Sequence, residues 1–242
     1  MKLSLIIPTF NEAKKIHLDL DAANQFLRAQ PFDSEVLIVN DGSRDETQKV
    51  AEELCGKYSN DKVAFRVLSY GENRGKGYAI RYGVSQAKGD LIAFADSGLC
   101  VPFSFLTYGI EKIERGADYA LASRRLKETK IKRQQPLYRK LGSKVFWFVV
   151  KGFMGVQVSD TQCGFKIYSN KAAKTIFHRV QTDGFMFDIE ALLVAKKLKL
   201  KHAEFPVEWS NDSDTRYHPI WGTLKNLREL TAIRLRSFST HA

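Results

Sequence analysis

The stretch MKLSLIIPTFNE at residues 1–12 sets the pattern for the whole chain, because a short apolar run passes directly into a polar loop. A run of this length, from Leu3 to Ile7, is typical of a strand that is buried on both faces of a sheet. Pro8 interrupts the run, and Asn11 and Glu12 follow it, so the stretch has neither the apolar length nor the cleavage site of a signal peptide. The sequence therefore predicts a buried first strand.

The same pattern repeats along the first 122 residues, where short apolar runs alternate with segments of helical spacing. It predicts further strands over 35–39, 63–68, 91–95 and 117–122, and helices over 13–27, 45–54, 75–87 and 102–115. Such alternation predicts an α/β fold, with a mostly parallel sheet flanked by helices on both faces. The second half is expected to add helices from 171 and near 187–198, a strand around 202–207 and a final basic helix. We expect a single domain over 1–242 with a basic helical C-terminal elaboration.

Composition limits the possible partners. The 242 residues include 38 Lys and Arg against 27 Asp and Glu, a formal charge of +11, so the partner is expected to be anionic: nucleic acid, a phospholipid surface or a phosphorylated substrate. The three cysteines form no CxxC pair, which argues against a disulfide framework and a zinc site and favours a reducing compartment. The most apolar run, 145–150, is far shorter than the ~20 residues of a membrane span.

Polar residues gather after several of the predicted strands. In a parallel sheet, ligands bind beyond the carboxyl ends of the strands, where Glu12, Asp41 and Asp96 are expected to meet Lys76 of the glycine loop GENRGKG. This loop has neither the spacing of a phosphate-binding P-loop nor that of a dinucleotide fingerprint. One interpretation is that these are turn and helix-cap residues. The other is a nucleotide site, where carboxylates bind base and ribose while Lys76 and backbone N–H groups meet the phosphates.

Eight stretches, in order along almost the whole chain, carry a family resemblance. They are IIPTFNE (6–12), VNDGSRDET (39–47), ENRGKGYAIRYG (72–83), GDLIAFAD (89–96), SRR (123–125), DTQCGFKIY (160–168), FDIEALLVA (187–195) and IRLRSF (233–238). With them the chain resembles family 2 glycosyltransferases of the Rossmann-like GT-A fold, closest to dolichyl-phosphate β-glucosyltransferases and other polyprenyl-phosphate glycosyltransferases. The pair DTQCGFK and FDIE separates this branch from polysaccharide synthases.

The resemblance implies an inverting enzyme that moves a hexose, glucose from UDP-glucose, to a polyprenyl or dolichyl phosphate. A GDP-mannose-dependent mannosyltransferase is the alternative. It also implies a nucleotide-sugar-binding half, 1–122, and an acceptor-binding half, 123–242. By the same resemblance, the nucleotide sugar is bound by Pro8, Phe10, Glu12, Asp41, Arg74, Lys76, Asp96 and Ser97, the acceptor by Ser123, Arg124, Arg139, Gln162, Asp188 and Glu190, and the catalytic residues are Asp96, Arg124 and Asp160.

One departure concerns the metal. Asp96 matches the first acid of the family's Asp-x-Asp, but Gly98 stands where the second acid is a metal ligand. Because Mg²⁺ is often held by one carboxylate plus substrate phosphates, Mg²⁺ or Mn²⁺ is expected on Asp96 and the diphosphate. The alternatives are a metal-free site in which Lys and Arg neutralise the leaving group, or a catalytically impaired protein that still binds the nucleotide sugar.

The basic charge is concentrated in one stretch. Residues 124–151 hold ten cationic side chains and one acid, or +9 of the chain's +11, beside the aromatic run 146–148. Such a stretch favours contact with an anionic membrane surface, although a solvated basic face over a core helix has the same composition. With the resemblance, it predicts a cytoplasmic protein, peripheral on the cytoplasmic face of a membrane. No nucleic-acid-binding signature is found, so a nucleic-acid partner is not expected.

Overall fold

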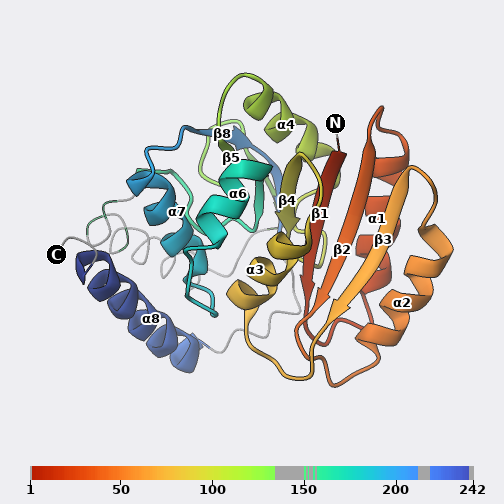
Figure 1. Cartoon of the computed structure of the whole chain (residues 1–242), viewed down its shortest axis with the longest axis horizontal. Helices are drawn as coiled ribbons and strands as arrows, with labels where there is room; N and C mark the ends of the chain where they lie inside the picture. Colours follow the sequence, from red (N-terminus) through yellow and green to blue (C-terminus); the bar gives the residue numbers. More distant parts are fainter. Residues whose placement is uncertain are drawn as a thin grey trace.

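A computed structural model describes residues 2–133, 150, 152, 155, 157–211 and 219–239. In this part of the chain one large sheet is built from β1 (Lys2–Thr9), β2 (Asp33–Asn40), β3 (Val63–Ser69), β4 (Leu91–Ala95), β5 (Tyr119–Ser123), β7 (Phe165–Ser169) and β8 (His202–Pro206). Its strand order is β3-β2-β1-β4-β7-β5-β8 (Figure 1). Every pairing is parallel except those of β7, which runs antiparallel to both β4 and β5.

The direction of β7 determines which loops meet. The carboxyl ends of β1, β2, β4 and β5 share one edge of the sheet, and the amino end of β7 arrives at that same edge. The loop that enters β7 therefore joins the loops that leave the parallel strands.

Helices cover both faces of the sheet (Figure 1). One face carries α1 (Ile16–Arg28), α2 (Thr47–Tyr58), the short 3-10 helix η1 (Phe103–Phe105) and α4 (Leu106–Glu114), and the other carries α3 (Lys76–Gln86), α6 (Asn170–Phe177) and α7 (Phe187–Lys197), with α8 (Pro219–Ser239) packed beyond them. Successive side chains of a strand point to opposite faces. In β1, Leu5 and Ile7 accordingly belong to the first apolar cluster and Ile6 to the second.

The expected mostly parallel α/β sheet is confirmed, and a final helix is present. The strand β7 was not predicted, because Lys166 interrupts the apolar run FKIYS; the structure buries this lysine completely. A small separate ribbon, β6 (Lys130–Arg133) paired with β9 (Glu208–Ser210), was also not predicted.

The ribbon corrects one interpretation of the basic stretch. Residues 130–133, which were expected in an interfacial or core helix, form an exposed strand instead. Residues 134–149 of the same stretch lie outside the described residues. None of the helices that the structure describes combines the length and apolar character needed to cross a membrane.

Candidate active site

Asp41, at the end of β2, holds the glycine loop that leads into α3. Its buried carboxylate accepts hydrogen bonds from the Tyr70 hydroxyl (2.9 Å), the Asn73 amide (2.9 Å) and the backbone N–H groups of Arg74 (2.7 Å) and Gly75 (2.9 Å). Burial raises the pKa of this carboxyl above its ordinary value, and these hydrogen bonds oppose the shift. Asp41 thus shapes the loop, and its binding to a nucleotide stays a prediction.

The start of α3 is capped by the protein itself. The N–H groups of Gly77 and Tyr78 donate to the Asp183 carbonyl, at 2.7 and 3.3 Å. These two N–H groups are therefore hydrogen-bonded within the protein, and the binding of phosphates by other backbone N–H groups of the glycine loop stays a prediction. Arg74 stacks its guanidinium 3.7 Å from the centre of the Tyr78 ring, so it lies over the first turn of the helix.

Lys76, the first residue of α3, reaches across to the end of β4. Its Nζ lies 2.5 Å from Oδ1 of Asp96. Burial opposes the positive charge, but the carboxylates of Asp96 and Asp188 outweigh it and raise the pKa of Lys76 above its ordinary value. A Cβ on Gly164 would fall 2.1 Å from Oδ2 of Asp96, so only glycine lets the incoming loop of β7 pack against this carboxylate.

Two acids from the β1–α1 region hold the loop that follows Asp96. The Ser97 hydroxyl donates to Glu12 at 3.2 Å. The fully buried Asp19 of α1 accepts from the N–H groups of Gly98 (2.9 Å) and Leu99 (3.0 Å). Burial raises the pKa of Asp19 to about 6, despite these two hydrogen bonds.

The described residues around Asp96 offer few ligands for a divalent ion. At the position of the second acid, Gly98 has φ +92°, a conformation that side chains rarely adopt, and its N–H is committed to Asp19. Within the described residues no group of three or more His, Cys, Asp or Glu side chains could hold a metal. The donor set does not fit an ion bound by the protein alone; Asp96 fits as one ligand of an ion held mainly by a substrate's phosphates.

Arg124 and Asp160 form a bidentate ion pair on the other side of the site. The Arg124 Nε and Nη2 atoms lie 2.6 and 2.8 Å from the two carboxylate oxygens of Asp160. The backbone N–H groups of Arg124 and Gln162 also donate to this carboxylate, each at 3.1 Å. Burial alone would raise the pKa of Asp160, but Arg124 and these donors lower it to about 2.

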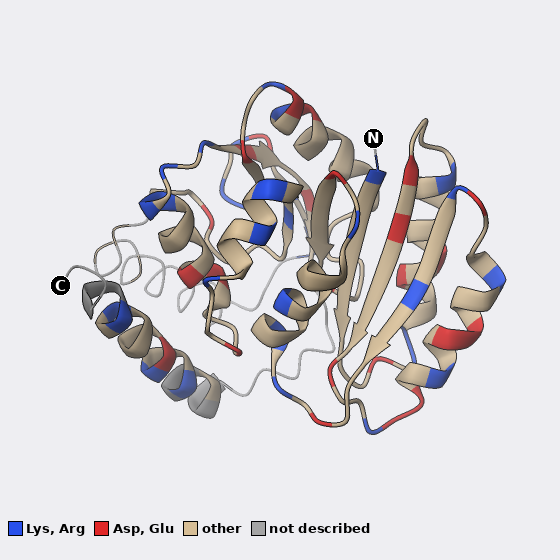
Figure 2. Ribbon diagram, in the orientation of Figure 1, with Lys and Arg blue, Asp and Glu red and all other residues tan. Residues whose placement is uncertain are grey.

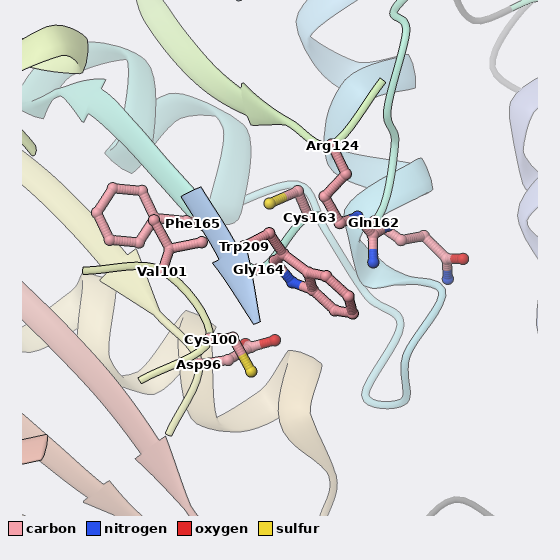
Figure 3. Close-up of a pocket in the computed structure, with 9 residues that line it drawn as sticks. All are labelled: Asp96, Cys100, Val101, Arg124, Gln162, Cys163, Gly164, Phe165 and Trp209. Carbon is pink, nitrogen blue, oxygen red and sulfur yellow. The ribbon is translucent and has the colours of Figure 1, made fainter. Parts of the chain in front are cut away.

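One pocket joins the two ion pairs. Figure 3 shows its lining, which is Asp96, Cys100, Val101, Arg124, Gln162, Cys163, Gly164, Phe165 and Trp209. The pocket brings together the predicted Asp96, Arg124 and Gln162, with Asp160 directly behind Arg124. A planar cation, a carboxylate and an indole ring around one space provide donors, acceptors and an apolar face for a polar ligand such as a sugar.

The other predicted acceptor residues that the structure describes lie outside this lining and contact other groups of the protein. The Ser123 hydroxyl is buried against Ser159 at 2.5 Å. Asp188 pairs with Lys166 inside the protein, and Glu190 accepts from the N–H groups of Gln181 and Thr182, at 3.0 and 2.7 Å. Their contact with an acceptor stays a prediction, and Arg139 lies outside the described residues.

The remaining residues that were predicted to bind the nucleotide sugar lie at the end of β1. Pro8 is inside β1, in register with Val39 of β2, and Phe10 and Glu12 follow the strand. Together with Asp41, Arg74 and Ser97 they line the edge of the sheet on the Lys76 side of the pocket. Their binding of a nucleotide sugar also stays a prediction.

Comparison with known proteins identifies the family. Residues 4–177 match the family described as "Glycosyl transferase family 2". The chain belongs to glycosyltransferase family 2. It is an enzyme of the hexosyltransferase type, and the expected family is confirmed.

Two curated relatives span nearly the whole chain. The human dolichyl-phosphate beta-glucosyltransferase is 34% identical over 97% of this chain and 75% of its own length. The Saccharomyces cerevisiae dolichyl-phosphate beta-glucosyltransferase is 30% identical over 96% of this chain and 74% of its own length.

The fold also matches solved structures. The structure of glucosyl-3-phosphoglycerate synthase from Mycobacterium tuberculosis with Mg²⁺ and UDP has a TM-score of 0.68 and 18% identity, and the match covers 97% of this chain and 78% of that one. At this identity the likeness concerns the fold, and it confirms the GT-A arrangement of this family 2 glycosyltransferase.

The residues that were not assigned to the site from the sequence include Trp209 and Cys163 of the pocket lining and the buried Lys166 of β7. The guanidinium carbon of Arg124 lies 5.6 Å from the centre of the Trp209 ring. Trp209 belongs to β9, shortly after the carboxyl end of β8, and an aromatic residue just beyond a strand was the signal for it in the sequence. Cys163 sits within the quoted DTQCGFK motif, and burial raises the pKa of its thiol to about 12, so it acts as a neutral packing group. The position of Lys166 inside the apolar run FKIYS was a signal in the sequence for a buried lysine.

Proposed function

We propose that this chain is an inverting glycosyltransferase that moves glucose from UDP-glucose to the phosphate of a polyprenyl or dolichyl lipid. Two ion pairs that face one pocket carry the proposal: Lys76 with Asp96 on the donor side, and Arg124 with Asp160 on the acceptor side. The two dolichyl-phosphate beta-glucosyltransferases support glucose and a lipid phosphate as the substrates. In this proposal residues 1–122 bind the nucleotide sugar and 123–242 the acceptor, within one domain.

The proposed chemistry needs no general base. A phosphate monoester has a second pKa near ~6, so its attacking oxygen is already anionic at neutral pH. Asp160 is unsuited to accept a proton, because its pKa is about 2 and both its oxygens are engaged by Arg124. The phosphate oxygen attacks the anomeric carbon directly, and the single displacement inverts its configuration.

The charged groups then have separate tasks. Lys76 neutralises the leaving nucleoside diphosphate, and Asp96 fixes the lysine in place. Arg124 binds the acceptor phosphate, with Asp160 holding the guanidinium plane in the pocket. Trp209 offers its ring as an apolar face beside the sugar.

A divalent ion would join with the donor. We propose that Asp96 would be the carboxylate ligand of a Mg²⁺ or Mn²⁺ ion bound together with the donor's diphosphate, and that such an ion would neutralise phosphate charge. Two of the synthase structures that share the fold contain UDP together with Mn²⁺ or Mg²⁺. The free protein is expected to bind Mn²⁺ weakly by calorimetry and tightly only with UDP present.

The proposed site of action is the cytoplasmic face of a membrane, with the protein peripheral on its anionic surface. The exposed basic strand β6 supports contact with an anionic surface, and Cys55, Cys100 and Cys163, which form no disulfide, support a reducing compartment. The same charge could attract nucleic acid, but we propose lipid as the partner. Sedimentation with anionic vesicles, compared with salt-dependent binding to DNA or RNA, separates the two.

The test of the whole proposal is a turnover assay. Release of UDP from UDP-glucose is measured with polyprenyl phosphate, in parallel with GDP-mannose, and in Mg²⁺, Mn²⁺ or EDTA. Turnover with UDP-glucose is the expected result. UDP binding without turnover under every condition would favour the catalytically impaired protein, and turnover with GDP-mannose alone would favour the mannosyltransferase.

A substitution separates acceptor from donor. Arg124→Ala is expected to reduce turnover at limiting lipid phosphate about 100-fold, because it removes a bidentate phosphate ligand, and to leave UDP affinity unchanged. Arg124→Lys keeps a cation for the buried Asp160 and so tests for a folding defect, and Arg28→Ala, at an exposed position in the last turn of α1 and away from β6, is the matched control. Equal losses of UDP affinity and acceptor use would contradict the assignment.

A further inference from the structure

The loop over residues 181–186, here named the capping loop, packs directly against the start of α3. Its Asp183 carbonyl accepts from Gly77 and Tyr78, and Arg81 of α3 donates to the Thr182 carbonyl at 2.8 Å and pairs with the Asp183 carboxylate. A Cβ on Gly77 would lie 2.3 Å from the Thr182 carbonyl oxygen. The loop and the helix start are therefore in backbone contact, one residue from Lys76.

The opposite side of the capping loop is held by α8. Glu229 accepts from the Met186 N–H at 3.1 Å, and a Cβ on Gly184 would fall 1.9 Å from a Glu229 oxygen. Arg236 donates to the Thr182 hydroxyl at 2.9 Å and lies 3.0 Å from Glu190. Both ends of the capping loop therefore form hydrogen bonds with α8, a helix that follows much later in the chain.

The outer part of α8 has a different character. Figure 2 shows that Lys and Arg outnumber Asp and Glu along this helix. Lys225, Leu227 and Arg228 are exposed, whereas Leu230 and Ile233 are buried in the second apolar cluster. The helix therefore packs firmly through its apolar side while Glu229 and Arg236 reach the loop.

We propose that Glu229 and Arg236 of α8 are positioning residues for the donor-site lysine, acting through the capping loop. The contact sequence runs from α8 to the capping loop, from the loop to the first N–H groups of α3, and from there to Lys76 and its partner Asp96. The inference rests on the proposed function only in that Lys76 meets the donor's diphosphate.

The physical reason is geometric. Lys76 is the first residue of α3, so its Cα moves with the helix start. A displacement of about 1 Å in a group that contacts the reacting centre can reduce the rate about 100-fold. Loss of the α8 contacts should loosen the capping loop, then the N–H groups of Gly77 and Tyr78, and then the lysine.

The test uses the full chain and four variants. Glu229→Ala and Arg236→Ala remove the two contacts, Glu229→Gln keeps an oxygen that can accept from Met186, and Arg228→Ala is the matched control on the exposed side of α8. Hydrogen exchange at the amides of 77 and 78 is measured without ligand, UDP affinity by calorimetry, and KM for donor and acceptor by turnover.

We expect Glu229→Ala and Arg236→Ala to speed this exchange and to weaken UDP binding about tenfold, the scale of one lost hydrogen bond to a charged group. The KM for the lipid phosphate should stay unchanged, Glu229→Gln should restore UDP binding, and Arg228→Ala should match the wild type. Unchanged exchange at 77 and 78, or equal losses for donor and acceptor, would overturn the inference. Hydrogen exchange and UDP affinity are measured without an acceptor. If the protein does not use the proposed lipid acceptor, these two measurements still test the role of Glu229 and Arg236.

Discussion

Among the described residues, the N-terminal half, 2–122, and the C-terminal half, 123–239, use their buried aspartates differently. In the N-terminal half, Asp41 and Asp19 accept hydrogen bonds from backbone N–H groups and so hold loops in shape. In the C-terminal half, Asp160 and Asp188 pair with the side chains of Arg124 and Lys166. Loss of an acid in the first half releases a loop, whereas loss of one partner in the second leaves a buried charge unpaired.

The largest effect is expected for Lys166→Met, because both members of this pair are almost inaccessible to water. Breaking a buried pair by removing one partner costs about 3–5 kcal/mol, and replacing both partners by apolar residues is often neutral. The free energy of unfolding, measured in urea, should fall by this amount in Lys166→Met. It should recover in Lys166→Met with Asp188→Leu. A single variant as stable as the wild type would show that the pair is not a special feature of the C-terminal half.

Asp19 predicts a pH effect in the N-terminal half. Its pKa is about 6 in the folded protein against an ordinary value of 3.8, so between these values the folded state keeps a proton that the unfolded state has lost. This linkage makes stability fall as the pH rises from about 4 to 6, by on the order of 3 kcal/mol, and then level off.

Asp19→Asn removes that contribution. As the pH rises from about 4 to 6, the unfolding free energy of Asp19→Asn should increase relative to that of the wild type. The other titrating groups contribute equally to both proteins, so their contributions cancel in this difference. Urea unfolding at several pH values from 4 to 7 measures it. Two parallel curves would mean that Asp19 titrates normally and that the loop at Gly98 does not depend on its charge state.

The two halves also differ in how far the sequence could predict them. In the N-terminal half, mostly apolar runs marked the strands, and the polar residues after them, Glu12, Asp41 and Asp96, do lie at one edge of the sheet. In the C-terminal half the loop from Asp160 to Gly164 enters its strand instead of leaving it. Its place at the same edge depends on β7 running antiparallel between β4 and β5, which is set by long-range pairing and not by any local pattern.

Buried polar residues account for the other differences. Lys166 makes β7 look unlike a buried strand, because its partner Asp188 is 22 positions further along the chain. Asp19 lies on an otherwise ordinary amphipathic helix, and its burial depends on a turn with positive φ at Gly98 and Leu99, about 80 residues away. The burial of Lys166 and of Asp19 can be explained only by a partner that is distant in the sequence. The family resemblance, which does include such long-range constraints, was what assigned Asp160 and Gln162 to the site.

A smaller effect is expected for Asp41→Asn. The substitution keeps the size of the side chain but replaces an acceptor oxygen with an NH₂ group that faces the N–H donors of Arg74 and Gly75. The loss of stability should be about 1–3 kcal/mol, since hydrogen bonds to a charged group are replaced. UDP affinity should fall with it, because the glycine loop loses its shape. Unchanged hydrogen exchange across residues 72–76 would show that Asp41 does not hold the loop.

The smallest effect on stability is expected at the surface. Lys132 on β6 lies 2.5 Å from Glu208, and Lys49 on α2 lies 3.9 Å from Glu46, so each half offers an exposed lysine in an ion pair. Neither Lys132→Ala nor Lys49→Ala should change the free energy of unfolding measurably, because such pairs are screened by water and salt.

Binding to vesicles of phosphatidylserine and phosphatidylcholine should distinguish these two variants. Lys132→Ala should bind about fivefold more weakly, the contribution of one cation near an anionic surface, and Lys49→Ala should bind as the wild type does. Equal weakening in both variants would mean that the attraction comes from the net charge of the whole chain and not from the basic strand of the C-terminal half.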